Sequence, residues 1–169
     1  MSFDAPDFAF GTPGENIRGA MLAYMDGLLP VDDDRPGRCL AVTRQLVQAG
    51  LGWSYDFFYE VFHSHPVEDE PDGDKWARSA MRSLREQGKR MAYTDTVPVV
   101  LSEVQAGDIY CNHKIGYSVG HIAVLLSGGI NAQLIENTST QRGTKISGFN
   151  RQSRLDEMPY AYAAEIFRL

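Results

Sequence analysis

The spacing of hydrophobic residues changes near position 90, and this change divides the chain into two parts. Before it, apolar residues recur three and four positions apart, a pattern typical of helices that are hydrophobic on one face. This spacing predicts helices over residues 15–29, 38–49 and 75–87. The aromatic segment 53–62 fits either a helix or a strand.

Beyond position 90 the apolar runs are too short for helices and favour β-strands. Gly128 and Gly129 lie between two of these runs and fit a hairpin turn. Because helices come first and strands follow, the sequence predicts an α+β fold with a mostly antiparallel sheet. The expected strands cover residues 97–101, 108–111, 121–126, 133–137, 144–146 and 160–169.

The overall composition is that of an ordinary globular domain. The chain has 169 residues, of which 43% are hydrophobic and 22% charged, enough for one domain with a sizeable core. Its net charge of −6 argues against a nucleic-acid partner, which would require a basic face. No apolar run approaches the roughly 18 residues of a membrane-spanning helix, so no membrane span is expected.

The first residues of the chain bear on where the protein works. They lack the basic segment followed by an apolar segment that marks a secretory signal. We therefore expect a cytoplasmic protein or one exported by a non-classical route. No pattern in the chain indicates the oligomeric state.

Cys39 is a candidate for chemistry because it lies at the start of the predicted helix 38–49. A cysteine reacts as the thiolate, and a free thiol has a pKa of about 8.5. The partial positive charge and the free N–H groups of a helix N-terminus lower that pKa. The same N–H groups can stabilise the oxyanion formed when an acyl group is attacked. The alternative is that Cys39 is a small buried residue of the core.

His121 opens the predicted strand 121–126 and is the candidate base that takes the proton from Cys39. A third residue has to orient the imidazole, and Glu136 and Asn137 end the next strand. Adjacent strand residues face opposite sides, so only one of the two can point at His121. We prefer Asn137, because an amide orients the ring without adding charge, and Glu136 is the second choice. Alternatively, His121 bonds the backbone at a strand end and Asn137 belongs to a turn.

Four segments carry this candidate chemistry, in the order Arg38-Cys39-Leu40-Ala41-Val42, Gln105-Ala106-Gly107-Asp108-Ile109, Gly120-His121-Ile122-Ala123-Val124 and Ile135-Glu136-Asn137-Thr138-Ser139. Together they resemble the NlpC/P60 group of cysteine peptidases and the related CHAP amidases. In that superfamily a Cys starts a helix, a Gly-Asp pair opens the first strand, a His opens the next, and a polar residue follows on the third. The resemblance covers residues 35–147. It implies a single papain-like domain over residues 1–169, with a catalytic core at 35–147 and an N-terminal extension and helix at 1–34.

The resemblance also implies a function. The protein would be a hydrolase, a thiol protease or amidase that cleaves an amide bond in the peptides of cell-wall peptidoglycan. Cys39 would be the nucleophile, His121 the general base and then the general acid, and Asn137 or Glu136 the orienting residue. The reaction would pass through a thioester and require no metal or organic cofactor. The partner would be a cell-wall peptide or another amide substrate, and the bond that is cleaved is left open.

A pair of histidines allows a different chemistry. His63 and His65 would point the same way on a strand and could share a zinc ion. The string around them resembles the JAMM metalloisopeptidases. That family has a Ser and an acidic ligand after the Pro, where this chain has Gly73 and Trp76. A solvated loop with two incidental histidines is therefore the favoured interpretation of residues 63–74.

A non-enzymatic alternative is a binding or immunity-type module that keeps the fold without activity. The aromatic run 53–59 would then form an interaction surface, although a place in the core is the simpler interpretation. Cys111, the second cysteine, is expected to pack at a strand end or beside the cleft.

Overall fold

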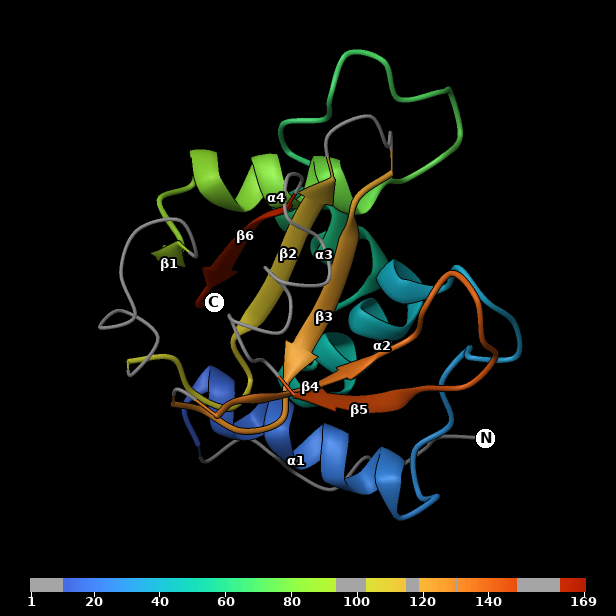
Figure 1. The fold of residues 1–169 in the computed structure, drawn as a ribbon, viewed down its shortest axis with the longest axis vertical. Helices are drawn as coiled ribbons and strands as arrows, with labels where there is room; N and C mark the ends of the chain where they lie inside the picture. The colour runs from blue at the N-terminus through green and yellow to red at the C-terminus, as the bar shows by residue number, and fades with distance from the viewer. Residues whose placement is uncertain (1–10, 94–102, 115–118, 130, 149–161) are drawn as a thin grey trace.

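The computed structural model describes residues 11–93, 103–114, 119–129, 131–148 and 162–169. Within these ranges four helices precede six strands, which confirms the predicted α+β fold class (Figure 1). The helices are α1 (Pro13–Met25), α2 (Cys39–Leu51), α3 (Tyr55–Phe62) and α4 (Ala77–Glu86). The strands are β1 (Arg90–Tyr93), β2 (Ile109–Lys114), β3 (His121–Leu125), β4 (Gln133–Glu136), β5 (Lys145–Gly148) and β6 (Tyr162–Phe167).

α1 begins earlier than the hydrophobic spacing predicts because Thr12 caps it. The Thr12 hydroxyl accepts a hydrogen bond from the Glu15 backbone N–H, and the Glu15 carboxylate accepts one from the Thr12 N–H. This reciprocal pair satisfies backbone donors that a helix leaves unpaired at its start. Within the described ranges, no helix combines the length and apolar character needed to cross a membrane.

The aromatic segment after α2 forms a helix, which settles the choice between helix and strand. The Ser54 hydroxyl accepts a hydrogen bond from the Phe57 N–H and so caps α3. Phe58 and Phe62, four residues apart, are buried and stacked on each other, whereas Tyr55 and Phe57 are exposed. The run is therefore partly core and partly surface.

α1 and α2 pack closely because α2 carries a glycine where they touch. The sequence predicts that Gly50 and Gly52 end this helix. The helix continues through Gly50 to Leu51, and Gly52, with φ +66°, ends it. A Cβ placed on Gly50 would lie only 2.7 Å from the Cα of Ile17, so a side chain there would force the two helices apart. Close approach, and not helix termination, explains this glycine.

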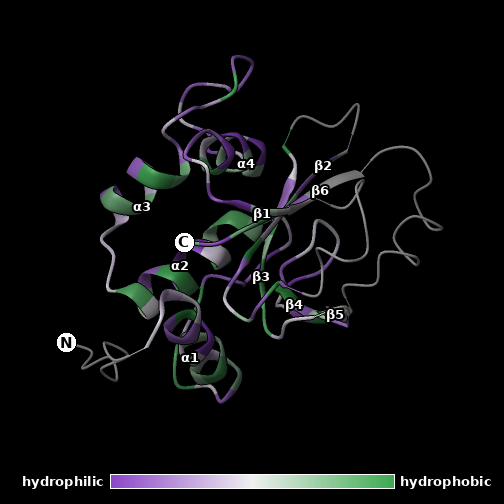
Figure 2. Ribbon diagram, turned by 90° about the vertical axis from the view of Figure 1, so that its left-hand side faces the viewer, coloured by the Kyte–Doolittle hydropathy of each residue, from purple (hydrophilic) through white to green (hydrophobic). Residues whose placement is uncertain are grey.

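The sheet has the strand order β1-β6-β2-β3-β4-β5, and neighbouring strands are antiparallel. β6 inserts between β1 and β2, which the hydrophobic pattern does not predict. It does not predict β1 either, and the expected strand 97–101 lies outside the described residues. The helices gather on one side of the sheet (Figure 2).

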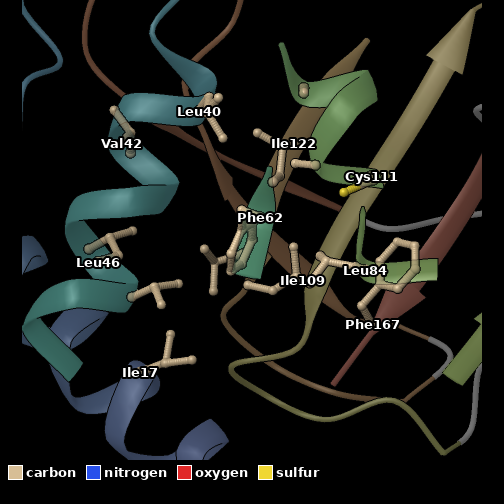
Figure 3. Packing of buried hydrophobic residues seen from close by; sticks show 14 of the residues in the cluster. Ile17, Leu40, Val42, Leu46, Phe62, Leu84, Ile109, Cys111, Ile122 and Phe167 are labelled. Atoms are coloured by element: carbon tan, nitrogen blue, oxygen red, sulfur yellow. The ribbon is translucent and has the colours of Figure 1, made fainter. Parts of the chain in front are cut away.

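Side chains along β3 alternate between two hydrophobic clusters. Ile122 and Val124 face the helices in the main cluster, whereas Ala123 and Leu125 belong to a second cluster on the other side. His121 lies two positions before Ala123, so its side chain leaves the strand on the same side as Ala123, away from the helices. The main cluster receives side chains from every helix, as Figure 3 shows for Ile17, Leu40, Val42, Leu46, Phe62 and Leu84.

Candidate active site

Cys39 is the first residue of α2, where the sequence predicts it. The first N–H groups of a helix have no partner within that helix, so they can stabilise negative charge at this end. The first turn of α2 holds no acidic residue that would oppose a thiolate. Cys39 is partly exposed and is not part of a disulfide. Its position therefore suits a reactive thiol.

His121, the first residue of β3, lies beside the Cys39 thiol and lowers its pKa. The backbone N–H groups of Leu40 and Ile122 also lower the pKa of this thiol. The side chains of Leu40 and Ile122 both lie in the main cluster (Figure 3). Core packing thus holds the start of α2 against the start of β3 and keeps the thiol beside the imidazole.

Glu136, the last residue of β4, holds the other side of the imidazole. Its Oε2 atom lies 2.6 Å from His121 Nε2, and its side chain is only 4% exposed. Because a carboxylate only accepts, this contact places a proton on Nε2 and leaves Nδ1 for Cys39. The Ser147 hydroxyl on β5 donates to Glu136 Oε1 at 2.6 Å, and Lys145 Nζ lies 3.9 Å from the same oxygen.

These contacts change the pKa values of both Cys39 and His121. Burial opposes the Cys39 thiolate, but the hydrogen bond and charge of His121 lower the pKa of the thiol below its ordinary value. Burial also opposes the imidazolium, but the hydrogen bonds to Cys39 and Glu136 raise the pKa of His121 to about 9. Both shifts favour a thiolate–imidazolium pair at neutral pH.

The preference for Asn137 as the residue that orients His121 is corrected by this geometry. Glu136 lies two positions after Leu134, so its side chain is on the side of the second cluster, where it reaches His121. Asn137 lies two positions after Ile135, so its side chain faces the helices. Asn137 is 1% exposed, and its Oδ1 accepts a hydrogen bond of 2.6 Å from the Arg38 backbone N–H. It therefore contacts the loop before the thiol, a role that sequence reasoning missed.

The glycine before His121 also has a structural reason. Gly120 has φ +69°, and a Cβ there would lie 3.0 Å from both Arg78 N and Asn112 O. The Arg78 N–H, in the first turn of α4, donates to the Val119 carbonyl at 3.0 Å. α4 thus packs directly against the turn that leads into His121, and only glycine fits there without displacing it.

The two histidines of the zinc alternative lie apart from this site and are not on a strand. His63 ends α3 and its Nε2 is paired with the Glu70 carboxylate. His65 lies in the following loop, where its Nδ1 is 2.9 Å from Ser64 Oγ. Within the described parts of the chain, no three His, Cys, Asp or Glu side chains are grouped so that they could hold a metal ion.

Cys111 lies in β2 in the main cluster and is fully buried. Burial raises the pKa of this thiol well above its ordinary value, and the negative charges of Glu165 and Cys39 add to the effect. Cys111 is therefore a core residue, and Cys39 is the cysteine with surroundings that favour a thiolate.

Comparisons with known proteins leave this geometry as the main guide to function, because no protein-family model, no curated protein and no solved structure matches the chain.

Proposed function

We propose that this protein is a cysteine hydrolase that cleaves an amide bond through Cys39, His121 and Glu136. The observation that carries the proposal is the contact of one imidazole with a thiol at a helix start and with a buried carboxylate. A helix terminus and a neighbouring imidazolium activate a thiol as nucleophile, and a carboxylate keeps the ring in the required tautomer. The papain-like form of the α+β fold is part of the same proposal.

In the first half of the reaction, the Cys39 thiolate attacks the carbonyl carbon of the amide. The carbon–sulfur bond forms, and the electron pair of the carbonyl moves to its oxygen. The free N–H groups at the start of α2 are placed to stabilise this oxyanion. The His121 imidazolium then gives its Nδ1 proton to the amide nitrogen, the carbon–nitrogen bond breaks, and the amine leaves a thioester on Cys39.

In the second half, neutral His121 accepts a proton from water as the water oxygen attacks the thioester carbon. The carbon–sulfur bond breaks, the acid product leaves, and the thiolate–imidazolium pair is restored. Glu136 keeps Nε2 protonated throughout, so that Nδ1 alone gives and accepts protons.

The substrate class is proposed from the sequence resemblance. The Cys39, Gly107-Asp108, Gly120-His121 and Glu136-Asn137 segments resemble NlpC/P60 and CHAP proteins, and that resemblance supports peptides of peptidoglycan as the substrate.

Digestion of purified peptidoglycan and its soluble muropeptides, followed by mass spectrometry of the products, tests this proposal. The wild type should release a new amine and a new carboxylate at one amide bond, and Cys39→Ala should release neither. Cys111→Ala is the matched control, because it removes the buried thiol and should keep the activity. Equal product formation by Cys39→Ala would refute the mechanism, and a reactive Cys39 without muropeptide cleavage would refute the substrate class alone.

A further inference from the structure

Asn137 connects two loops that meet at the start of α2. Its Oδ1 accepts the Arg38 N–H at 2.6 Å, and its Nδ2 donates to the carbonyls of Arg35 at 3.1 Å and Gly143 at 2.8 Å. The amide therefore uses both its acceptor and its two donor hydrogens on backbone groups. A buried side chain satisfied in this way has one available orientation.

Backbone contacts extend the same junction on both sides of Asn137. The Gly37 N–H donates to the Thr138 carbonyl at 2.9 Å, and the Gly143 N–H donates to the Asp33 carbonyl at 2.7 Å. The loop before Cys39 is thus bound along its length to the segment that follows β4. Asn137 is the side chain at the centre of this contact.

Glu136 ends β4 and Asn137 follows it directly. These two neighbours therefore hold the two members of the proposed catalytic pair. Glu136 faces one side and holds His121, whereas Asn137 faces the other side and holds the residue before Cys39. We propose that Asn137 is a positioning residue for the nucleophile, an inference that rests on the proposed function. It fixes the start of α2 so that the Cys39 sulfur and the oxyanion-stabilising N–H groups keep their relative geometry.

Two reagents separate this role from a role in activating the thiol. Iodoacetamide is attacked at a saturated carbon with loss of iodide, so no oxyanion forms. p-Nitrophenyl acetate is attacked at its carbonyl carbon, passes through an oxyanion, and loses p-nitrophenolate to leave a thioester. Both need the thiolate, but only the second needs N–H groups held beside it. The ratio of the acylation rate to the alkylation rate, measured above the pKa of Cys39, therefore reports how well the N–H groups are positioned beside the sulfur.

The experiment measures both rate constants and the pH midpoint of alkylation in the wild type, Asn137→Ala and Glu136→Gln. We expect Asn137→Ala to lower acylation by p-nitrophenyl acetate about 10- to 100-fold, as for a displaced reacting group. Its alkylation rate and midpoint should stay close to those of the wild type. Glu136→Gln should instead raise the pH midpoint of Cys39 alkylation. A neutral amide stabilises the His121 imidazolium less than a carboxylate does, and the thiolate then loses part of its positive partner. Asn131→Ala, at an exposed turn, is the matched asparagine control and should change neither rate.

An unchanged acylation-to-alkylation ratio in Asn137→Ala would overturn the inference, and so would a raised midpoint like that of Glu136→Gln. If Asn137→Ala does not fold, Asn137→Asp replaces it, because this variant keeps the acceptor for the Arg38 N–H and loses both donors. The ratio of acylation to alkylation rates is then measured in Asn137→Asp. Hydrogen exchange at the Arg38 amide should accelerate in Asn137→Ala, and unchanged exchange would also contradict the proposal. A wild-type Cys39 that reacts with neither reagent would refute the proposed function itself.

Discussion

Two imidazoles in this protein have similar partners on one ring nitrogen and different partners on the other. Nε2 of His121 contacts Glu136, which also accepts from Ser147, and Nε2 of His63 contacts Glu70, which also accepts from Ser79. The side chains of His121 and His63 are 21% and 17% exposed, so burial does not distinguish them. A histidine held by a buried glutamate and a serine therefore occurs twice.

The difference lies on Nδ1. His121 has the Cys39 thiol beside it, at the start of a helix, whereas Nδ1 of His63 lies 3.4 Å from the Lys75 ammonium. A lysine offers no group that the ring could activate at neutral pH. A His–Glu pair is therefore not enough by itself to mark the proposed catalytic site. The feature that distinguishes the proposed site is the Cys39 thiol beside the other ring nitrogen.

The second glutamate has a structural task. Glu70 accepts hydrogen bonds from the Ser79 hydroxyl and the Trp76 N–H, and so holds the loop 63–76 against the start of α4. Burial raises the pKa of the Glu70 carboxyl, but the bonds from Ser79 and His63 outweigh it and lower the pKa overall. Substitutions at matched positions of the two sites should therefore separate activity from stability.

The histidine substitutions should have the largest effect. His121→Ala should lower amide hydrolysis by about 10⁴-fold or more, since it removes the general base and acid. His63→Ala should keep hydrolysis within about threefold and lower the free energy of unfolding by about 1 kcal/mol. Turnover of muropeptides and urea denaturation measure the two quantities. Comparable loss of turnover in both variants would contradict the assignment of His121.

The glutamate substitutions should rank next. Glu136→Gln should lower turnover by about 10²- to 10⁴-fold, because an amide can donate to Nε2 and permits the wrong tautomer. Glu70→Gln should leave turnover unchanged and destabilise the fold by about 1–3 kcal/mol, because it weakens bonds to a buried group. Full turnover in Glu136→Gln would show that another group orients His121.

The pH profile of turnover should be bell-shaped with a falling limb near pH 9. In the proposed mechanism activity needs the Cys39 thiolate and the His121 proton, so turnover should rise through the lowered pKa of the thiol and fall as His121 deprotonates at about 9. At pH 10 the loss should be about tenfold. A falling limb that stays in place in Glu136→Gln would argue against His121 as its origin, whereas Glu70→Gln should not move it.

The serine substitutions should have the smallest effect on catalysis. Ser147→Ala removes one donor to Glu136 and should lower turnover only a few-fold, and Ser147→Thr should restore it because it retains the hydroxyl. Ser79→Ala should leave turnover unchanged and lower stability by about 1 kcal/mol. A loss of turnover in Ser147→Ala that Ser147→Thr does not reverse would point to packing and not to the hydrogen bond.

The sequence predicts the elements that carry the site better than the contacts between them. Cys39 and His121 follow from local patterns, a glycine-containing turn before a helix and a Gly-His pair before a buried strand. Strand alternation also shows that Glu136 and Asn137 point opposite ways. It does not show which of them faces His121, because both sides of β4 are covered and both residues are buried.

Other features depend on chain segments that meet only in three dimensions. The Asn137 contacts join residues about 100 positions apart, and no local pattern indicates them. β1 is a four-residue strand with mixed polarity, and its pairing with β6 depends on the return of the chain to that edge. Such contacts follow from topology, and the order of strands in the sheet is not encoded by hydrophobic spacing alone.

The pH dependence of Cys39 alkylation by iodoacetamide, followed by peptide mass spectrometry, tests the pairing of Cys39 with His121 most directly. The wild type should show a midpoint below the value of about 8.5 for a free thiol. His121→Ala should raise that midpoint, and His63→Ala should leave it in place. A wild-type Cys39 that titrates like a free cysteine, or one whose midpoint moves equally in both variants, would contradict a thiolate–imidazolium pair at this site.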